Sequence, residues 1–314
     1  FTVDGGFFPH GALSRTSDGH WTGLLMALVV VMFSFGGTCV KLIKPYFGPE
    51  YITFFRFVIG VAFLLLLRCF RRQEIKNGPT PGSWEKSLAG WILLGAVAKW
   101  LAYLMENYGL SHGPSYGNIV VQPSQTVALT LFSVFFLKEK LSPRKLLCIL
   151  LCVLGVLCIS WNGRSLDSFF HENAFLTLLF VSTGFCAATH ILAQKMVADK
   201  MNIIDSNLTI FTVSGVLAAV PLVPETLGGA LAGVRPDLPC ILAMLFFGFI
   251  TGMGFYLNAK AIPLVPFYMV GTIQSTMVIF AILWGVLFFH ETITLYIITG
   301  TVLFMVGLIG LQFG

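Results

Sequence analysis

Charged residues are scarce in this chain. Only 11% of its 314 residues are charged, whereas 56% are hydrophobic, and the mean hydropathy is +0.86. A soluble domain carries about 25% charged residues because its surface must face water. The scarcity therefore excludes a water-soluble globule. A net charge of +5 spread over the whole chain also leaves no concentrated basic stripe, so we expect no nucleic-acid partner.

Motifs of several enzyme and metal classes are missing as well. There is no GxxxxGK[ST] loop for ATP, so energy has to come from gradients or exchange. Neither His171 nor His290 is followed by the second histidine of a zinc-protease motif. The seven cysteines lack CxxC spacing, which indicates neither a metal site nor a disulfide framework. We therefore expect no metal, no cofactor and no enzyme activity.

The chain is instead rich in apolar runs of about twenty residues, the length that crosses a bilayer as a helix. We predict an all-α integral membrane protein with ten transmembrane helices joined by short loops. Residues 1–20 are Gly-rich and lack the order of a signal peptide, so they are predicted to be a cytoplasmic tail. The predicted spans are 21–42, 51–67, 88–107, 116–137, 144–161, 173–193, 207–222, 238–258, 266–289 and 295–313.

Lysine and arginine gather in alternate loops. The loops on the side of the N-terminus hold thirteen of them, and the loops on the opposite side hold four. Cytoplasmic loops retain positive charge. We therefore expect both termini in the cytoplasm of a multi-pass protein of the cell membrane, inner or plasma.

The sequence matches itself when it is shifted by 152 residues, which places Gln122 over Gln274 and Glu139 over Glu291. The repeat is five spans long, and an odd number makes the second copy cross the membrane in the opposite direction. We predict two inverted five-helix repeats, at 21–161 and 173–313. Secondary transporters use this architecture and hold substrate between the halves. The alternative is a duplicated bundle that transports nothing.

One face of the third span carries Lys99, Tyr103 and Glu106, spaced four and three residues apart. Charges inside a membrane usually face a cavity and are functional. We expect Lys99 to meet a substrate carboxylate, Glu106 a substrate amine and Tyr103 an apolar side chain. Alternatively, Glu106 is solvated near the helix end, and Lys99 pairs with it or with helix carbonyls.

The first and sixth spans carry matching polar faces. Ser34, Thr38 and Lys41 share a face of the first span, and the 152-residue shift places Cys186 and His190 over Ser34 and Thr38. We expect a shared cavity wall that includes Thr38 and His190, although small hydroxyls also serve ordinary helix packing. Imidazole changes charge near neutral pH, so His190 is a candidate for proton coupling, as is Glu106. The alternative is a hydrogen-bonded core histidine.

Amides and hydroxyls mark the fourth and ninth spans, at Asn118, Gln122, Gln125, Thr272, Gln274, Ser275 and Thr276. We expect Asn118, Gln122, Gln274 and Ser275 to bind polar substrate atoms, because an amide both donates and accepts hydrogen bonds. Alternatively, Gln122 and Gln274 bond to each other as glue between helices. Pro123 removes a backbone hydrogen bond and is expected to loosen the fourth span.

Several further residues are candidates for lining a pocket or for a structural role. Trp100 and Trp284 fall deep enough in their spans to line a pocket for an apolar group. Arg56 is predicted to be structural, either reaching the outer surface or holding a loop carboxylate such as Glu50. Glu139 and Glu291 lie at the ends of the fourth and ninth spans and are expected to fix the junctions there. After the fourth span, Ser142–Pro143 resembles a helix N-cap followed by Pro at the first helical position.

The segment 108–161, with its polar turn, long apolar helix and FLKEKLSPRKLL, resembles the EamA-type module of the drug/metabolite transporter superfamily. KAIPLVP through FFHETITLYIITG to VGLIGL resembles a second copy, and FFRF around Arg56 is similar to part of the first module. The resemblance implies ten helices, cytoplasmic termini and efflux or exchange of small metabolites. The ninth span has no Lys or Arg, unlike the more basic span expected in the nucleotide-sugar and phosphate branches.

We therefore expect a secondary active transporter that moves small amphipathic metabolites by alternating access, with amino acids as the first candidate. An exchanger of organic anions, sugar phosphates or nucleotide sugars is the alternative, because Lys41, Arg56 and Lys99 give a positive excess. A membrane-embedded enzyme and a channel are remote alternatives. The expected partners are a small metabolite and the lipid bilayer, and a homodimer is left open.

Overall fold

The computed structural model describes residues 16–72, 75, 86–112, 121–161, 163, 165, 174–228, 231, 233–289 and 294–313. All regular structure within these ranges is helical. The first half contains α1 (Thr16–Ser34), α2 (Gly36–Ile43), α3 (Pro49–Phe70), α5 (Lys86–His112), α6 (Val121–Phe135) and α7 (Pro143–Trp161). The second half contains α9 (Ala174–Val197), α10 (Ile203–Ala219), α11 (Leu222–Leu227), α12 (Leu238–Phe249), η2 (Ile250–Gly254), α13 (Phe255–Ala261), η3 (Ile262–Leu264), α14 (Phe267–Ser275), α15 (Met277–Phe289) and α16 (Leu295–Phe313).

Each of the ten predicted spans overlaps one helix or a run of consecutive helices. Five helical segments are long and apolar enough to cross a membrane: Gly23–Ile43, Pro49–Phe70, Lys86–His112, Leu238–Leu264 and Phe267–Phe288. Two shorter apolar helices are Ile203–Ala219 and Leu295–Leu311. The protein is thus an all-helical, multi-pass membrane protein, and the number of ten crossings stays a prediction.

Three of the long helical segments are interrupted. The segment Gly23–Ile43 breaks at Phe35 between α1 and α2, and the segment Leu238–Leu264 contains the π-helical turn η2. The segment Phe267–Phe288 breaks after Ser275, between α14 and α15. Position 275 lies 152 residues after Pro123. Pro123 itself lies in the first described turn of α6. A loosening of the fourth span at Pro123 stays a prediction, because residues 113–120 just before α6 lie outside the described part of the chain.

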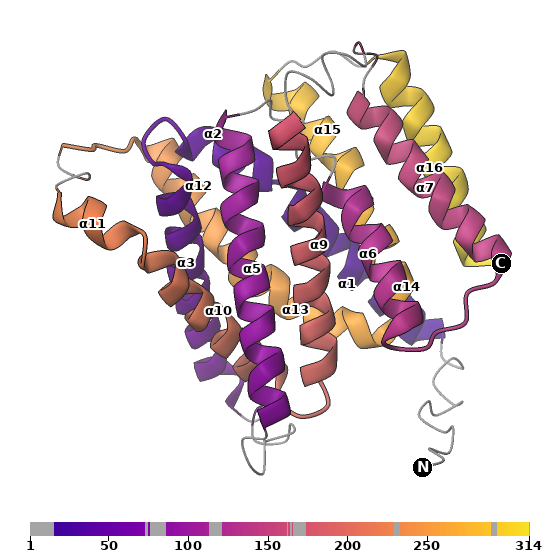
Figure 1. Cartoon of the computed structure of the whole chain (residues 1–314), viewed down its shortest axis with the longest axis horizontal. Helices are drawn as coiled ribbons and strands as arrows, with labels where there is room; N and C mark the ends of the chain where they lie inside the picture. Colours follow the sequence, from indigo (N-terminus) through magenta and orange to yellow (C-terminus); the bar gives the residue numbers. More distant parts are fainter. Residues whose placement is uncertain are drawn as a thin grey trace.

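The two halves have matching helix bounds. The segment 86–112 of α5 corresponds to 238–264, and α7 at 143–161 corresponds to α16 at 295–313, each 152 residues later. α7 and α16 also pack against each other at one edge of the molecule (Figure 1). Their contacts run from Cys148 with Gly307 to Gly155 with Gly300 and Cys158 with Tyr296, so the two helices are antiparallel.

Contacts between the halves hold the remaining helices together. α5 packs on α9, and α3 packs on α10 at the edge opposite α7 and α16 (Figure 1). α6 contacts both α9 and α14, while α12 contacts α2 and α3. Because helices of one half pack mainly on helices of the other, the middle of the protein is enclosed by both halves. The site described below lies in that middle.

Candidate functional site

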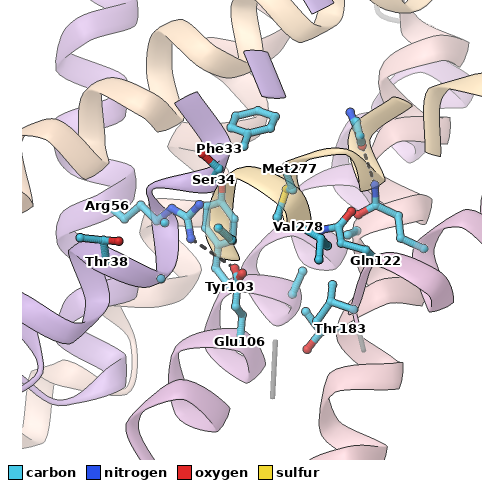
Figure 2. Close-up of a pocket in the computed structure, with 18 of the residues that line it drawn as sticks. Phe33, Ser34, Thr38, Arg56, Tyr103, Glu106, Gln122, Thr183, Met277 and Val278 are labelled. Carbon is cyan, nitrogen blue, oxygen red and sulfur yellow. Dashed lines mark hydrogen bonds and ion pairs between the residues drawn. The ribbon is translucent and has the colours of Figure 1, made fainter. Parts of the chain in front are cut away.

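A cavity of about 170 Å³ lies between the two halves of the chain. Helices α1, α2, α3, α5 and α6 line it from the first half, and α9, α13, α14 and α15 line it from the second. Figure 2 shows side chains from both halves pointing toward the same space. The polar residues of its lining are Ser34, Thr38, Lys41, Arg56, Lys99, Tyr103, Glu106, Gln122, Gln125, Thr183 and Gln274.

The cavity lies nearer to one end of the helix bundle than to the other. We call the end at which α6 stops and α14 begins the Glu139 face, because Glu139 follows α6 there. α6 lines the cavity only with residues near its other end, Val121, Gln122 and Gln125. α5 contributes residues from 99 onward, and the α14–α15 segment contributes residues from Gln274 onward. The cavity therefore extends from the middle of the protein away from the Glu139 face.

Arg56 of α3 lies buried in the cavity wall. Its Nη1 is 3.4 Å from Glu106 Oε2, and its Nε donates to Thr251 Oγ1 at 2.9 Å. The guanidinium carbon also lies over the rings of Tyr103, at 3.3 Å, and Phe247, at 3.9 Å. Stacking and ion pairing together satisfy a charge that would be costly in the membrane interior. Figure 2 shows Arg56, Tyr103 and Glu106 together at one end of the cavity.

These contacts revise the expectation for Arg56. Glu106, and not the loop residue Glu50, is the carboxylate that Arg56 holds. The side chain is 7% exposed, so it does not reach the outer surface. Arg56 has the structural contacts that we expected, and it also forms part of the cavity lining. The alternative that Glu106 pairs with Lys99 is not what the structure shows.

Lys99 faces the cavity without a carboxylate of its own. Its Nζ lies 4.1 Å from the ring centre of Tyr103 and 3.7 Å from that of Phe255. Within the described part of the chain, Lys99 makes no ion pair and no hydrogen bond, since the carboxylate of Glu106 is held by Arg56. Ring faces compensate a cation by about 0.5–2 kcal/mol, much less than an anion would. The Lys99 ammonium can therefore accept an anionic group.

The opposite end of the cavity is lined by amides. Gln125 Nε2 donates to Gln274 Oε1 at 2.5 Å, and Gln274 Nε2 donates to Asn258 Oδ1 at 2.8 Å. This chain of bonds links α6, α14 and α13. Gln122, the repeat equivalent of Gln274, does not bond to it, and the Gln122 Oε1 atom has no partner in the described residues. The two glutamines therefore do not pair with each other as polar glue.

His190 of α9 lies outside the cavity lining, in an aromatic layer on its Glu139-face side. It is fully buried, and its Nδ1 is 3.1 Å from the carbonyl oxygen of Gly95. The rings of Phe211 and Phe255 contact it, with centroid distances of 6.0 and 5.5 Å. The Nε2 atom has no partner in the described residues. A role in proton coupling stays a prediction.

The structure brings six of the predicted substrate residues to the cavity: Thr38, Lys99, Tyr103, Glu106, Gln122 and Gln274. Ser275 and Trp100 do not line it. Ser275 Oγ lies 2.9 Å from Thr126 Oγ1 between α6 and α14, and Trp100 packs in the core around α3 and α10. Asn118 and Glu291 lie outside the described residues. Trp284 Nε1 donates to Ser34 Oγ at 2.7 Å beside the cavity.

Sequence reasoning missed the contribution of the eighth span. Thr251 and Phe255 contact Arg56 and Lys99, and Asn258 accepts from Gln274. The signal was present, because these three residues lie 152 positions after Lys99, Tyr103 and Glu106. The shift therefore pairs the predicted stripe of α5 with a neutral stripe of the second half, of which Phe255 lines the cavity while Thr251 and Asn258 are buried behind it.

Glu139 lies at the junction where we expected a structural glutamate. Its carboxylate accepts from the backbone N–H groups of Phe267, at 3.1 Å, and Tyr268, at 3.4 Å, which begin α14. The following helix α7 starts at Pro143, and Ser142 Oγ accepts from the Lys145 N–H at 3.3 Å. The N-cap expected at Ser142–Pro143 is therefore present.

Comparison with known proteins agrees with this geometry. The chain matches the EamA-like transporter family twice, over residues 20–161 and 175–313. No curated protein sequence matches it. A solved structure titled "Crystal structure of protein" shares 15% sequence identity and a TM-score of 0.70, covering 95% of this chain and 98% of its own. At that identity the likeness concerns the fold. From its two family matches, the chain belongs to the EamA-like transporter family, a family of membrane transporters of small molecules.

Proposed function

We propose that the protein is a secondary active transporter that moves small amphipathic metabolites by alternating access. The main support for this proposal is the cavity, which is enclosed by both halves of the chain and extends only toward the face opposite the Glu139 face. The antiparallel packing of α7 on its repeat equivalent α16 supports inverted repeats. Transporters with inverted repeats hold substrate between the halves and expose it to each side in turn.

Amino acids are the first candidate substrates. The Lys99 ammonium is available for a carboxylate, and the rings of Tyr103 and Phe255 offer an apolar wall. Gln122 and Gln125 supply amide groups for the polar remainder. A cavity of about 150 Å³ admits benzene, so a cavity of about 170 Å³ suits a small metabolite rather than a nucleotide sugar.

Small organic anions are the second candidate, and one observation favours them. Among the described residues, three basic side chains line the cavity, Lys41, Arg56 and Lys99, against one acidic side chain, Glu106. Glu106 is already held by Arg56, which leaves less charge for a substrate amine. An anion without an amine would therefore balance the cavity better than a zwitterion would. Sugar phosphates share this charge and belong in the same test.

The membrane setting follows from the same proposal. Ten crossings, termini in the cytoplasm and a place in the inner or plasma membrane agree with the excess of Lys and Arg on one side of the chain. Efflux or exchange across that membrane would be driven by gradients. A homodimer stays an expectation, to be measured by light scattering of the purified protein in detergent.

Flux into proteoliposomes tests the proposal. Purified protein is reconstituted and supplied with radiolabelled leucine, 4-methylpentanoate and a hexose phosphate, with protein-free vesicles as the baseline for passive leak. We expect saturable uptake of at least one compound above that baseline. Inhibition by unlabelled organic acids but not by amino acids would select the second candidate. Absence of saturable uptake or exchange across a wider panel of amino acids, amines and organic anions would refute the proposal.

A further inference from the structure

Helices α6 and α14 meet in a tight seam directly beyond the amide end of the cavity. The α6–α14 seam consists of the contacts of Thr126 and Leu129 with Gly271 and Ser275. Thr126 Oγ1 lies 2.9 Å from Ser275 Oγ, and a Cβ atom on Gly271 would lie 2.9 Å from Thr126 Cα. All four residues are buried. A solute in the cavity therefore meets closed packing on its way to the Glu139 face.

Glu139 closes this seam at its end on the Glu139 face. Its two hydrogen bonds to Phe267 and Tyr268 join the end of α6 to the start of α14 across 128 residues of sequence. The N-cap residue of α14, Pro266, makes no side-chain cap bond of its own. A carboxylate at a helix N-terminus satisfies free N–H groups and is favoured by the helix dipole. α14 thus takes its cap from the other half of the protein.

The backbone before Glu139 is strained. Lys138 has φ of 54°, in the left-handed region, and is the one such non-glycine residue among those described. This conformation is disfavoured for a residue with a Cβ atom and marks sites that the surrounding structure holds in place. Here it turns the chain so that Glu139 faces α14. Because Glu139 is partly exposed, water can replace its two bonds when they break.

We propose that Glu139 is a latch that holds the α6–α14 seam closed, and that substrate leaves toward the Glu139 face when this latch releases. Closure of the seam by Glu139 follows from the contacts alone, whereas release of substrate toward the Glu139 face rests on the proposed transport function. Glu139 touches no substrate in this scheme, so it is a positioning residue that controls which side of the cavity is open.

The latch is tested by the reactivity of a cysteine in the seam. Thr126→Cys places a buried thiol there, and native Cys152, buried between α7 and α16, serves as a control within the same molecule. Labelling by a water-soluble maleimide is followed at both sites by mass spectrometry of peptides. We expect Glu139→Ala to speed labelling of position 126 by about tenfold or more, as loss of a charge-assisted hydrogen bond implies, and to leave Cys152 unchanged.

Several outcomes separate a latch from a general loss of stability. Glu139→Gln keeps the shape and one acceptor, so it should give an intermediate rate, and Lys140→Ala on the exposed neighbour should give the parental rate. Equal acceleration at position 126 and at Cys152 would mean global unfolding and would overturn the proposal. An unchanged rate at position 126 in folded Glu139→Ala or Glu139→Gln protein would overturn it as well.

The link to transport is tested by closing the seam covalently. In Thr126→Cys/Ser275→Cys protein, two sulfur atoms replace two oxygen atoms that lie 2.9 Å apart, close enough for a disulfide after a small shift. Oxidation should stop flux in proteoliposomes, and reduction should restore it. Undiminished flux through fully crosslinked protein would refute release at the seam. If the parental protein transports nothing, the proposed function fails, but the labelling experiment still decides whether Glu139 is a latch.

Discussion

Tyr103 and Phe255 occupy matching positions of the two repeats, 152 residues apart, and their rings contact the same ammonium, that of Lys99. Their ring centroids lie 6.3 Å apart in an edge-on arrangement. Each half of the protein therefore supplies one ring to the place where the unpaired charge lies. A movement of one half against the other would change this contact directly.

Replacing Lys99 separates its role in binding from its role in folding. Lys99→Met removes an intramembrane charge that has no carboxylate partner in the described residues, so we expect the melting temperature to stay the same or rise. A metabolite that stabilises the wild type in a thermal-shift screen should no longer do so. Lys44→Met, at an exposed position, serves as the control and should keep the ligand-induced shift. Retention of that shift in Lys99→Met would remove Lys99 from the site.

The pair of Arg56 and Glu106 should respond unequally to substitution. Glu106→Gln keeps an acceptor for the guanidinium, whereas Arg56→Lys loses the flat group that stacks on Tyr103 and Phe247 and reaches Thr251. We expect Arg56→Lys to cost about 1.5–3 kcal/mol of unfolding free energy and Glu106→Gln to cost less. Urea titration in detergent measures both, and equal costs would contradict the stacked arrangement.

The amide chain predicts a cost for removing its central member. Gln274→Met deprives Gln125 Nε2 and Asn258 Oδ1 of their partners at once. Each buried polar group left unpaired costs about 1–3 kcal/mol, so a fall in the melting temperature is expected. Thr299→Ala is the matched control, because this exposed hydroxyl bonds only to its own helix at Leu295. A fall no larger than that of the control would show that the amide chain contributes nothing to stability.

The close contact of α7 with α16 predicts opposite effects of one substitution at two glycines. A Cβ atom on Gly155 would lie 2.5 Å from Phe304 N, whereas one on Gly90 of α5 would meet nothing within 4 Å. Gly155→Ala should destabilise the protein by about 1–3 kcal/mol through overpacking. Gly90→Ala should stabilise it by about 0.5–1 kcal/mol through helix propensity. Thermal unfolding of the two variants compares them, and an equal response would refute the close packing.

Much of the fold was predictable because bilayer physics constrains it. Apolar length located the helices, and the 152-residue repeat anticipated that α5 and the segment Leu238–Leu264 would share bounds. The cavity residues Lys99, Tyr103 and Glu106 were found because charge inside a membrane is costly and helical spacing places all three on one face. These are local properties of single helices.

Contacts between helices could not be predicted in the same way. Nothing in the spacing of one helix tells whether Glu106 pairs with Lys99 or with Arg56, since that choice depends on how α3 and α5 pack. The same holds for Gln274, which bonds to Gln125 and not to its repeat equivalent. A repeat predicts which residues correspond, but it does not predict which residues contact each other.

Uptake by reconstituted protein tests most directly whether the cavity between the halves is a transport site. Wild-type and Lys99→Met proteoliposomes are compared over rising concentrations of the labelled compound that the wild type takes up best, with protein-free vesicles as the baseline. The account predicts saturable uptake by the wild type and baseline uptake by Lys99→Met in folded protein. Equal saturable uptake by both, or no saturable uptake of any tested metabolite by the wild type, would contradict it.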